Sequence, residues 1–324
     1  PGDAVVRVKT DMELKNPALR DWPALRIQDT IKNPHPRKEI GSKYRVWPLL
    51  DFQSAVEDHL QGVTHIIRGK DLMDSTRKQT LLYEHFGWEY PETMYWGRVK
   101  VHEWGGFSTS QMRKDIESGK FTGWSDPRLP TIAGLSGTGI QAESLRNFWV
   151  ELGVTQKDIS VPLSSLYSHN TKIIDDDAPR ISFIRDPISL ELSGNQQSIV
   201  EIPTHPNFPA MGSRKIQLNS QQVLIESTDF GEEKLRLKEF ADFDISEKSA
   251  EFVSQERSDT RKIIHWASVD TSSKATLQTV SNGQISKIEG VLEHHNLIKG
   301  DIVQIERIGY GVIGENNTII FTHD

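Results

Sequence analysis

Two short segments combine residue types that could bind an anion. The first is residues 68–71, RGKD, which directly follow a β-branched run at residues 63–67. In an open α/β sheet, ligands bind just past the carboxyl ends of strands, so charged side chains there are site candidates. A solvated loop between a strand and a helix has the same composition. The pattern alone therefore leaves both interpretations open.

The second segment is residues 105–110, GGFSTS, which precede a helix predicted from residue 111 to 117. Ser108 or Thr109 could cap that helix, because hydroxyl side chains accept hydrogen bonds from the free amides of a first turn. A capped helix N-terminus is itself an anion site. A structural cap and a phosphate-binding loop are therefore compatible interpretations.

The elements around the first segment follow from hydrophobic spacing. Apolar residues at 46–50 predict a buried strand, and residues 52–60 carry apolar side chains three and four apart, which predicts a helix. Gly62 fits the end of that helix. Residues 63–67 predict a second buried strand, and residues 75–86 a second helix. This order of elements indicates an α/β domain.

The spacing of apolar residues and turn signals changes along the chain. Residues 141–152 have helical spacing. From residue 160 onward, apolar runs are short and turn signals recur about every 8 to 12 residues, which favours β barrels or sandwiches. The predicted fold class is therefore α/β plus all-β.

Composition narrows the classes of function. The chain has 324 residues, 36% hydrophobic, and no cysteine, so it forms no disulfide and no thiolate metal site. The formal net charge of −7 argues against indiscriminate nucleic-acid binding. Residues 226–259 hold eleven acids and five bases, whereas residues 98–128 hold six bases and four acids. A specific RNA ligand remains possible on the basic surface. His294 and His295, on opposite faces of a strand, make a poor metal site.

Four segments carry a family resemblance. Residues 51–71, DFQSAVEDHLQGVTHIIRGKD, closely resemble DFxxAxxDHLxGITHVxRGKD of class I aminoacyl-tRNA synthetases. The subfamily is the glutamyl and glutaminyl one, in its archaeal and eukaryotic form. Similar matches occur at residues 121–140, FTGWSDPRLPTIAGLSGTGI, at residues 178–192, APRISFIRDPISLEL, and at residues 303–313, VQIERIGYGVI.

The resemblance implies a domain order. Residues 1–30 would end the acceptor-stem-binding insertion, and residues 31–120 would form the second half of a Rossmann-type catalytic domain with a KMSKS-like loop. Residues 121–158 would be the helical stem-contact region, and residues 159–324 two anticodon-binding β-barrels of six strands each. The HxGH motif of the family's first half does not occur in this sequence. We therefore expect the chain to be a C-terminal portion.

The resemblance also implies a site for an amino acid and ATP. Arg68 occupies the position that is arginine in glutamate-specific members, and Asp51 and Leu50 would complete the amino-acid pocket, although Leu50 replaces a frequent tyrosine. The loop that contacts the ATP phosphates would contain Ser108, Thr109 and Ser110, with Thr109 where many members have lysine. Mg²⁺ would enter with ATP.

The implied macromolecular partner is tRNA(Glu), with Arg128, Arg180, Arg214 and Gln304 as contact residues. The implied activity is the ligation of L-glutamate to this tRNA in the cytoplasm, with no DNA or membrane partner and no resident metal. Two alternatives remain open: a glutaminyl-tRNA synthetase, which Arg68 disfavours, and a non-catalytic tRNA-binding protein.

Overall fold

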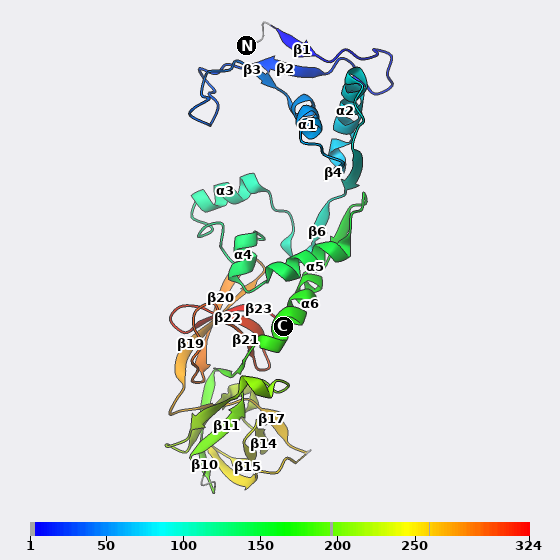
Figure 1. The fold of residues 1–324 in the computed structure, drawn as a ribbon. Helices are drawn as coiled ribbons and strands as arrows, with labels where there is room; N and C mark the ends of the chain where they lie inside the picture. Colours follow the sequence, from blue (N-terminus) through cyan, green and yellow to red (C-terminus); the bar gives the residue numbers. More distant parts are fainter. Residues whose placement is uncertain (1–3, 195–196, 259) are drawn as a thin grey trace. The chain divides into compact units, whose positions relative to one another are not determined.

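The structure is a computed structural model that describes residues 4–194, 197–258 and 260–324 (Figure 1). The chain divides into two compact units. The first unit comprises Pro1–Lys100 and Gly153–Val161, and the second comprises Val101–Leu152 and Pro162–Asp324. Among the residues described, no helix has the length and apolar character needed to cross a membrane.

The first unit is an α/β arrangement. An antiparallel sheet contains β1 (Val5–Arg7), β2 (Pro23–Ile27) and β3 (Val46–Pro48), and a parallel pair contains β4 (His65–Gly69) and β5 (Glu92–Trp96). The helices are α1 (Leu50–Leu60) and α2 (Met73–Phe86), and two further short strands are β6 (Val99–Val101) and β7 (Ile159–Val161). The predicted α/β character of this region is confirmed.

Both helices of the first unit end where the sequence predicts. Gly62 has φ +68° and Gly87 has φ +65°, the left-handed conformation that glycine adopts without a Cβ penalty. Between α1 and α2, Ala55, Leu82 and Tyr83 are almost completely buried. The tyrosine hydroxyl donates to the Ala55 carbonyl oxygen at 2.9 Å, which ties the two helices together.

The prediction of two buried strands at residues 46–50 and 63–67 is wrong. Val46 is 54% exposed and Ile67 is 55% exposed. β3 is an edge strand and β4 belongs to a two-stranded sheet, and both carry exposed apolar side chains. Strand pairing also runs further than predicted: Arg68 pairs with Tyr95, so Arg68 lies within β4 and not in a loop after it.

The second unit begins with helices. These are α3 (Thr109–Glu117), α4 (Ile132–Gly137), α5 (Ala142–Leu152) and α6 (Leu163–Ile174). α5 confirms the predicted helix, and the buried Asn170 of α6 accepts from Ser144 of α5 at 2.8 Å. Within residues 159–324 the sequence favours strands throughout, but residues 163–174 are helical and the two large sheets begin only at Arg180.

Two seven-stranded sheets follow. The first has the order β17-β14-β15-β16-β10-β13-β18. Its strands are β10 (Pro187–Ser193), β13 (Gln222–Glu226), β14 (Lys234–Leu237), β15 (Ala241–Ser246), β16 (Ser249–Ser254), β17 (Lys262–Ile264) and β18 (Ala267–Ser268). A separate ribbon pairs β11 (Ile199–Pro203) with β12 (Ser213–Gln217).

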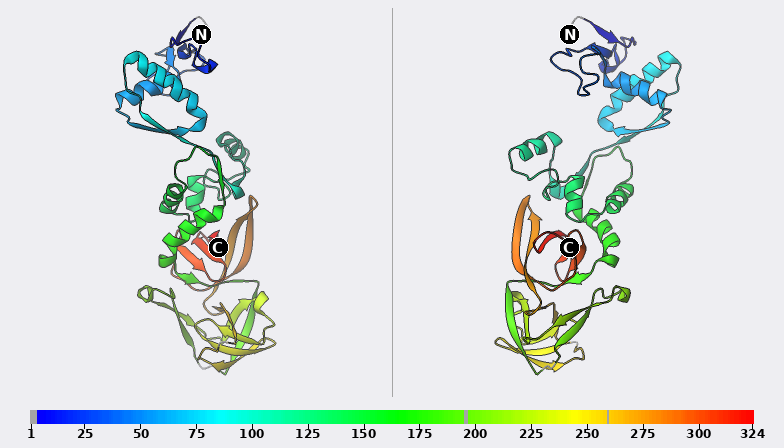
Figure 2. Two further views of the ribbon diagram at one scale, coloured as in Figure 1. Left: turned by 90° about the vertical axis from the view of Figure 1, so that its right-hand side faces the viewer. Right: turned by 60° about the vertical axis from the view of Figure 1, so that its left-hand side comes forward.

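The second sheet has the order β8-β21-β22-β23-β19-β20-β9. Its strands are β8 (Arg180–Ile181), β9 (Phe183–Arg185), β19 (Ser273–Ser281), β20 (Gln284–Leu292), β21 (Ile302–Ile305), β22 (Gly309–Ile313) and β23 (Thr318–His323). β19 and β20 form the long orange hairpin of Figure 2.

The end strands explain how this second sheet curls. β8 and β9 stand at opposite ends of the strand order, yet only Ser182 separates them along the chain. The sheet therefore returns on itself as a nearly closed barrel, in which β8 and β9 are one bent segment. In the first sheet, two residues, His265 and Trp266, separate the end strands β17 and β18 along the chain.

The structure predicts that Gly290 permits this closure. Gly290 of β20 pairs with Arg185 of β9, and an added Cβ would lie 2.5 Å from the Ile184 carbonyl oxygen and 2.6 Å from the Phe183 ring. Gly290→Ala should therefore destabilise the chain by about 1–3 kcal/mol through overpacking. Urea unfolding followed by circular dichroism measures this.

Gly106→Ala is the matched control, because an added Cβ there meets no described atom within 4 Å. Equal unfolding midpoints for the two variants would show that closure tolerates a side chain at position 290.

Candidate functional site

Arg68 lies on β4 with neutral hydrogen-bonding partners. Its Nη1 donates to the Gln79 side-chain oxygen at 2.9 Å and to the Thr76 hydroxyl at 3.3 Å, both on α2. Among the residues described, no carboxylate forms an ion pair with Arg68. The guanidinium is half-buried and keeps an uncompensated positive charge. This arrangement suits an anionic ligand.

Gln79 connects Arg68 with Asp51. Gln79 is 1% exposed, and its Nε2 donates to the Asp51 carbonyl oxygen at 3.2 Å and to the Ser54 hydroxyl at 2.6 Å. Its Oε1 also accepts from the Tyr90 hydroxyl at 2.7 Å. Burial raises the pKa of the Tyr90 phenol, although the positive charge of Arg68 opposes the rise. The Tyr90 hydroxyl therefore donates a hydrogen bond to Gln79 and helps to hold its side chain in place.

The sequence analysis missed Gln79. It lies three residues before Leu82 and four before Tyr83, so helical spacing places it on their buried face. A polar residue on a buried helix face was the available signal. The structure thus brings Arg68 and Asp51 together, whereas Leu50 is 62% exposed on the first turn of α1. The Asp51 carboxylate forms an ion pair with Lys78 at 2.8 Å.

A cavity of about 460 Å³ lies at the carboxyl ends of β4 and β5. Lys70 and Arg98 line it together with Asp158, which lies far away in sequence. Asp158 forms an ion pair with Lys70 at 2.9 Å and accepts from the Arg98 amide at 2.7 Å. The hydrogen bond from the Arg98 backbone N–H and the hydrogen bond from Lys70 both lower the pKa of the Asp158 carboxyl.

The segment that carries Asp158 approaches β5 closely at Gly97. A Cβ on Gly97 would lie 2.2 Å from the Lys157 carbonyl oxygen, so only glycine permits this contact. Sequence reasoning missed Arg98 and Asp158, because nothing in the local pattern indicates that residues 153–161 return to the ends of these strands.

Ser108 caps α3 in the second unit, as predicted. Its Oγ accepts from the Gln111 amide at 3.2 Å and lies 3.4 Å from the Ser110 Oγ. Gly105, with φ +60°, precedes this exposed turn. Ser108 and Thr109 therefore stand at a capped helix N-terminus, which is suited to bind an anion. Arg68 belongs to the other unit.

Arg128 has a partner within its own loop. Two of its nitrogens, Nε and Nη2, contact the two carboxylate oxygens of Asp126 at 2.8 and 2.7 Å. Asp126 is 1% exposed, and the hydrogen bonds from Arg128 hold the pKa of its carboxyl well below the usual range. The guanidinium also lies 4.7 Å from the centre of the Phe121 ring. The Arg128 guanidinium is thus paired with an acid of its own loop.

Arg180 and Arg214 line one cavity of about 450 Å³, together with His294 and Asn296. The Arg180 side chain is 9% exposed and contacts the Asp175 carboxylate at 2.6 Å. Arg180 is therefore not an unpaired surface cation, because its charge neutralises a carboxylate at the junction of α6 and β8.

Arg214 is also paired with an acid. Its Nε lies 2.6 Å from Glu293, a nearly buried side chain whose pKa burial raises to about 7, with Arg214 opposing the rise. Gln304 of β21 is the strand partner of Arg180 on β8. The structure thus brings Arg180 and Arg214 to one cavity, and Gln304 lies beside Arg180 on the neighbouring strand.

Comparisons with protein families cover most of the chain. A model described as "tRNA synthetases class I (E and Q), catalytic domain" matches residues 1–176. A second, described as "tRNA synthetases class I (E and Q), anti-codon binding domain", matches residues 178–263. The boundary between them falls between α6 and β8, where the large sheets begin.

Relatives named glutamate–tRNA ligase are similar along nearly the whole chain. The protein of Methanosarcina mazei is 46% identical over 99% of this chain and 57% of its own length. Those of Methanosarcina acetivorans and Archaeoglobus fulgidus are 45% and 42% identical, over 95% and 99% of this chain and 54% and 58% of their own lengths. The chain thus spans little more than half the length of these relatives. It belongs to the class I tRNA synthetases of the E and Q group.

Proposed function

We propose that this chain is part of a glutamate–tRNA ligase, which activates L-glutamate with ATP and transfers it to tRNA(Glu). The observation that carries the proposal is the environment of Arg68, whose guanidinium is bonded only to neutral Gln79 and Thr76 among the residues described. A guanidinium binds a carboxylate through two parallel charge-assisted bonds. The side chain of glutamate supplies that carboxylate, and glutamine does not.

For ATP, we propose that the N-terminus of α3 meets the phosphates. Ser108, Thr109 and Ser110 occupy its cap and first turn, and Arg113 and Lys114 on the same helix are candidates for the cation that replaces the lysine of related loops. Catalysis by these groups is positioning and electrostatic stabilisation of the charge that develops on the α-phosphate.

Mg²⁺ would neutralise phosphate charge when it is bound. The described residues contain no group of three acidic or histidine side chains that could hold a metal by themselves. Phosphate oxygens and water molecules are usual ligands of this ion, and ATP would supply the phosphates. The residues of this chain bind and orient the nucleotide.

For tRNA, we propose that the two seven-stranded sheets are anticodon-binding barrels within residues 159–324. Each sheet counts one bent segment as two strands, which supports six strands in each barrel. Residues 121–158 would be the helical region that contacts the stem of the tRNA. Residues 31–120 would be the second half of the catalytic domain, and residues 1–30 would be the end of the acceptor-stem-binding insertion. A cytoplasmic location follows from this role in translation.

Aminoacylation by the protein expressed from the complete gene tests the proposal. Glutamate and glutamine should each be offered with tRNA(Glu) and tRNA(Gln). Charging of glutamate onto tRNA(Glu) is the expected result. Preference for glutamine would identify a glutaminyl-tRNA synthetase, and tRNA binding without any charging would identify a non-catalytic tRNA-binding protein.

Arg68→Gln should remove the charge that recognises glutamate. The expected result is a fall in kcat/KM for glutamate of roughly 30-fold or more, because a desolvated charge pair is lost. The preference for glutamate over glutamine should narrow. Arg77→Gln, which loses an exposed pair with Asp74 on α2, is the control. Unchanged glutamate kinetics would make Arg68 a structural residue of β4.

The turn at Ser108 should become more protected when ATP binds. Hydrogen exchange of the peptide covering residues 105–115, with and without ATP, measures this in the protein from the complete gene. The amides of a helix N-terminus that hold phosphate exchange more slowly than free ones. A peptide from α5 serves as the reference. Identical exchange of residues 105–115 in both states would exclude this loop from the ATP site.

Gln304→Ala should weaken cognate tRNA binding more than binding of a tRNA with a changed anticodon. Gln304 makes no side-chain hydrogen bond with the part of the chain described, so its amide can meet a base. The expected loss is about fivefold, the worth of one hydrogen bond of ~1 kcal/mol. Gln278→Ala, on β19 of the same sheet, is the control. Equal weakening of both tRNAs would assign Gln304 to a contact without sequence preference.

A further inference from the structure

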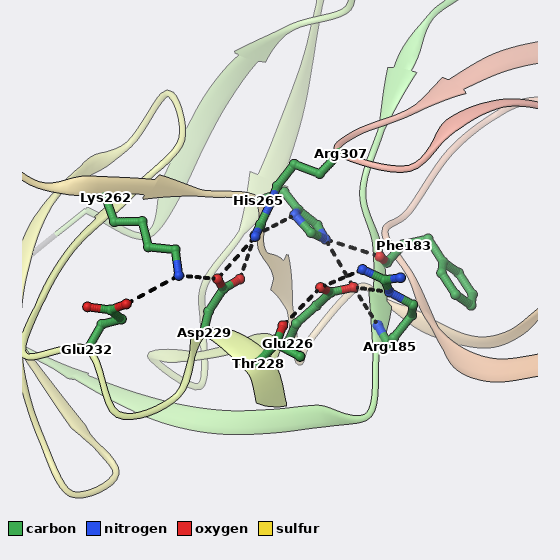
Figure 3. Close-up of polar contacts among 9 residues, drawn as sticks. All are labelled: Phe183, Arg185, Glu226, Thr228, Asp229, Glu232, Lys262, His265 and Arg307. Carbon is green, nitrogen blue, oxygen red and sulfur yellow. Dashed lines mark hydrogen bonds and ion pairs between the residues drawn. The ribbon is translucent and has the colours of Figure 1, made fainter. Parts of the chain in front are cut away.

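A cluster of charged side chains joins the two large sheets inside the second unit (Figure 3). We call it the junction cluster, and it consists of Arg185, Glu226, Asp229, Glu232, Lys262, His265 and Arg307. β9 and the turn between β21 and β22 contribute the two arginines from the nearly closed barrel. The other members come from the sheet that contains β13 and β17.

Two bidentate arginine–carboxylate pairs, here called forks, connect one sheet with the other. Arg185 holds Glu226 through Nε–Oε1 at 2.6 Å and Nη2–Oε2 at 3.0 Å. Arg307 holds Asp229 through Nη1–Oδ2 at 2.5 Å and Nη2–Oδ1 at 3.1 Å. Bidentate pairs of this kind fix orientation as well as distance. Two of them, placed side by side in Figure 3, restrict rotation of one sheet against the other.

The charges of the junction cluster balance within it. Glu226 and Asp229 are buried, whereas the two arginine side chains are about 40% exposed. Lys262 adds contacts to Asp229 at 3.1 Å and to Glu232 at 3.3 Å. Three cations thus face three carboxylates. The guanidinium groups are directed at protein carboxylates, so the cluster is built as a joint and not as a phosphate-binding patch.

His265 lies between the two forks and is 1% exposed. Its Nε2 lies 3.2 Å from the Phe183 carbonyl oxygen and 3.8 Å from Glu226, and its Nδ1 lies 3.4 Å from Arg307 Nη1. One tautomer satisfies both bonds: the Nε2–H donates to Phe183, and the unprotonated Nδ1 accepts from Arg307. The neutral imidazole thus bonds to Arg307 of one fork and lies beside Glu226 of the other.

A proton on Nδ1 would remove the acceptor for Arg307 and place two N–H groups face to face. The groups that face His265 act in both directions: burial and Arg307 favour the neutral form, whereas Glu226, the Phe183 carbonyl and Glu306 favour the charged form. Burial is the largest effect, so the pKa of His265 is lowered. The contribution of neutral His265 is full above its unfolded pKa of about 6.5 and is lost as the pH falls from there through the lower folded pKa.

We propose that the junction cluster fixes the angle between the two sheets and that His265 is its positioning residue, releasing Arg307 when it becomes protonated. The consequence for RNA rests on the proposed function. A tRNA that contacts both sheets binds well only while the sheets hold one angle, so the cluster contributes to affinity without touching the RNA.

Spin-label distances test the geometry directly. The chain has no cysteine, so Lys248→Cys in the β15–β16 turn and Lys287→Cys on β20 place one label on each sheet. The distance distribution should be narrow at neutral pH and broad in Arg307→Ala. Arg236→Ala is the matched control, because it removes an arginine from buried Asp242 within one sheet. Equal broadening in both variants, or in neither, would overturn the proposal.

His265→Gln tests whether the pH dependence comes from protonation of the histidine and not from the arginine–carboxylate pairs. Glutamine keeps an amide donor for Phe183 and takes up no proton. The wild-type distribution should broaden as the pH is lowered toward about 5, the range in which histidine titrates. That of His265→Gln should stay narrow. The same pH dependence in both would remove His265 from the mechanism. Should Arg307→Ala fail to fold, Arg307→Lys, which keeps the charge and loses the fork, should show intermediate broadening.

Binding of tRNA(Glu) gives the functional readout. If Arg307→Ala holds the binding angle only about one fifth of the time, the apparent Kd rises about fivefold. The dependence of log Kd on log salt concentration should keep its slope, because no phosphate contact is lost. A slope smaller by about one would make Arg307 a phosphate ligand and overturn the proposal. Absence of tRNA binding by the unsubstituted protein from the complete gene would count against the proposed function, while the spin-label result still decides the junction.

Discussion

A buried carboxylate held by an arginine is the interaction on which the second unit depends. It recurs as Asp126 with Arg128 in the loop before α4, and as Glu293 with Arg214, which lines the 450 Å³ cavity. A buried charge without a partner is strongly destabilising, so each of these acids requires its arginine. The arginines therefore hold the fold together before they can serve a ligand.

Arg68 differs from these arginines in its surroundings. Its neighbours Gln79 and Thr76 are neutral, and Gln79 is itself fixed by Tyr90, Ser54 and the backbone of Asp51. The guanidinium is thus oriented without being neutralised. Orientation lowers the entropic cost of binding, and the unbalanced charge supplies selectivity for an anion. An arginine that has this environment is suited to a ligand, whereas an arginine already bonded to aspartate is suited to the fold.

Burial also changes the meaning of the charge distribution. Residues 226–259 carry an excess of acids, but Glu226, Asp229 and Asp242 are buried and paired with Arg185, Arg307 and Arg236. The sequence count therefore overstates the negative charge that this region presents to solvent. This region is therefore less repulsive to an anion than its composition indicates, because these three acids are buried and paired.

The sequence by itself determined the local elements and the family. Helical spacing and left-handed glycines placed α1 and α2, the cap at Ser108 was predicted from one hydroxyl side chain, and long motifs carried the resemblance. These features depend on neighbours within a few residues, and a local sequence pattern shows them.

The tertiary structure alone decided which side chains are buried and which distant residues they contact. It left Val46 of β3 and Ile67 of β4 exposed, and it brought Asp158 to the ends of β4 and β5. It also paired Arg180 with Asp175 and placed His265 between the two arginine–carboxylate pairs of the junction cluster. Each of these outcomes depends on a contact between distant residues, and no local pattern in the sequence shows which distant residue will be the partner.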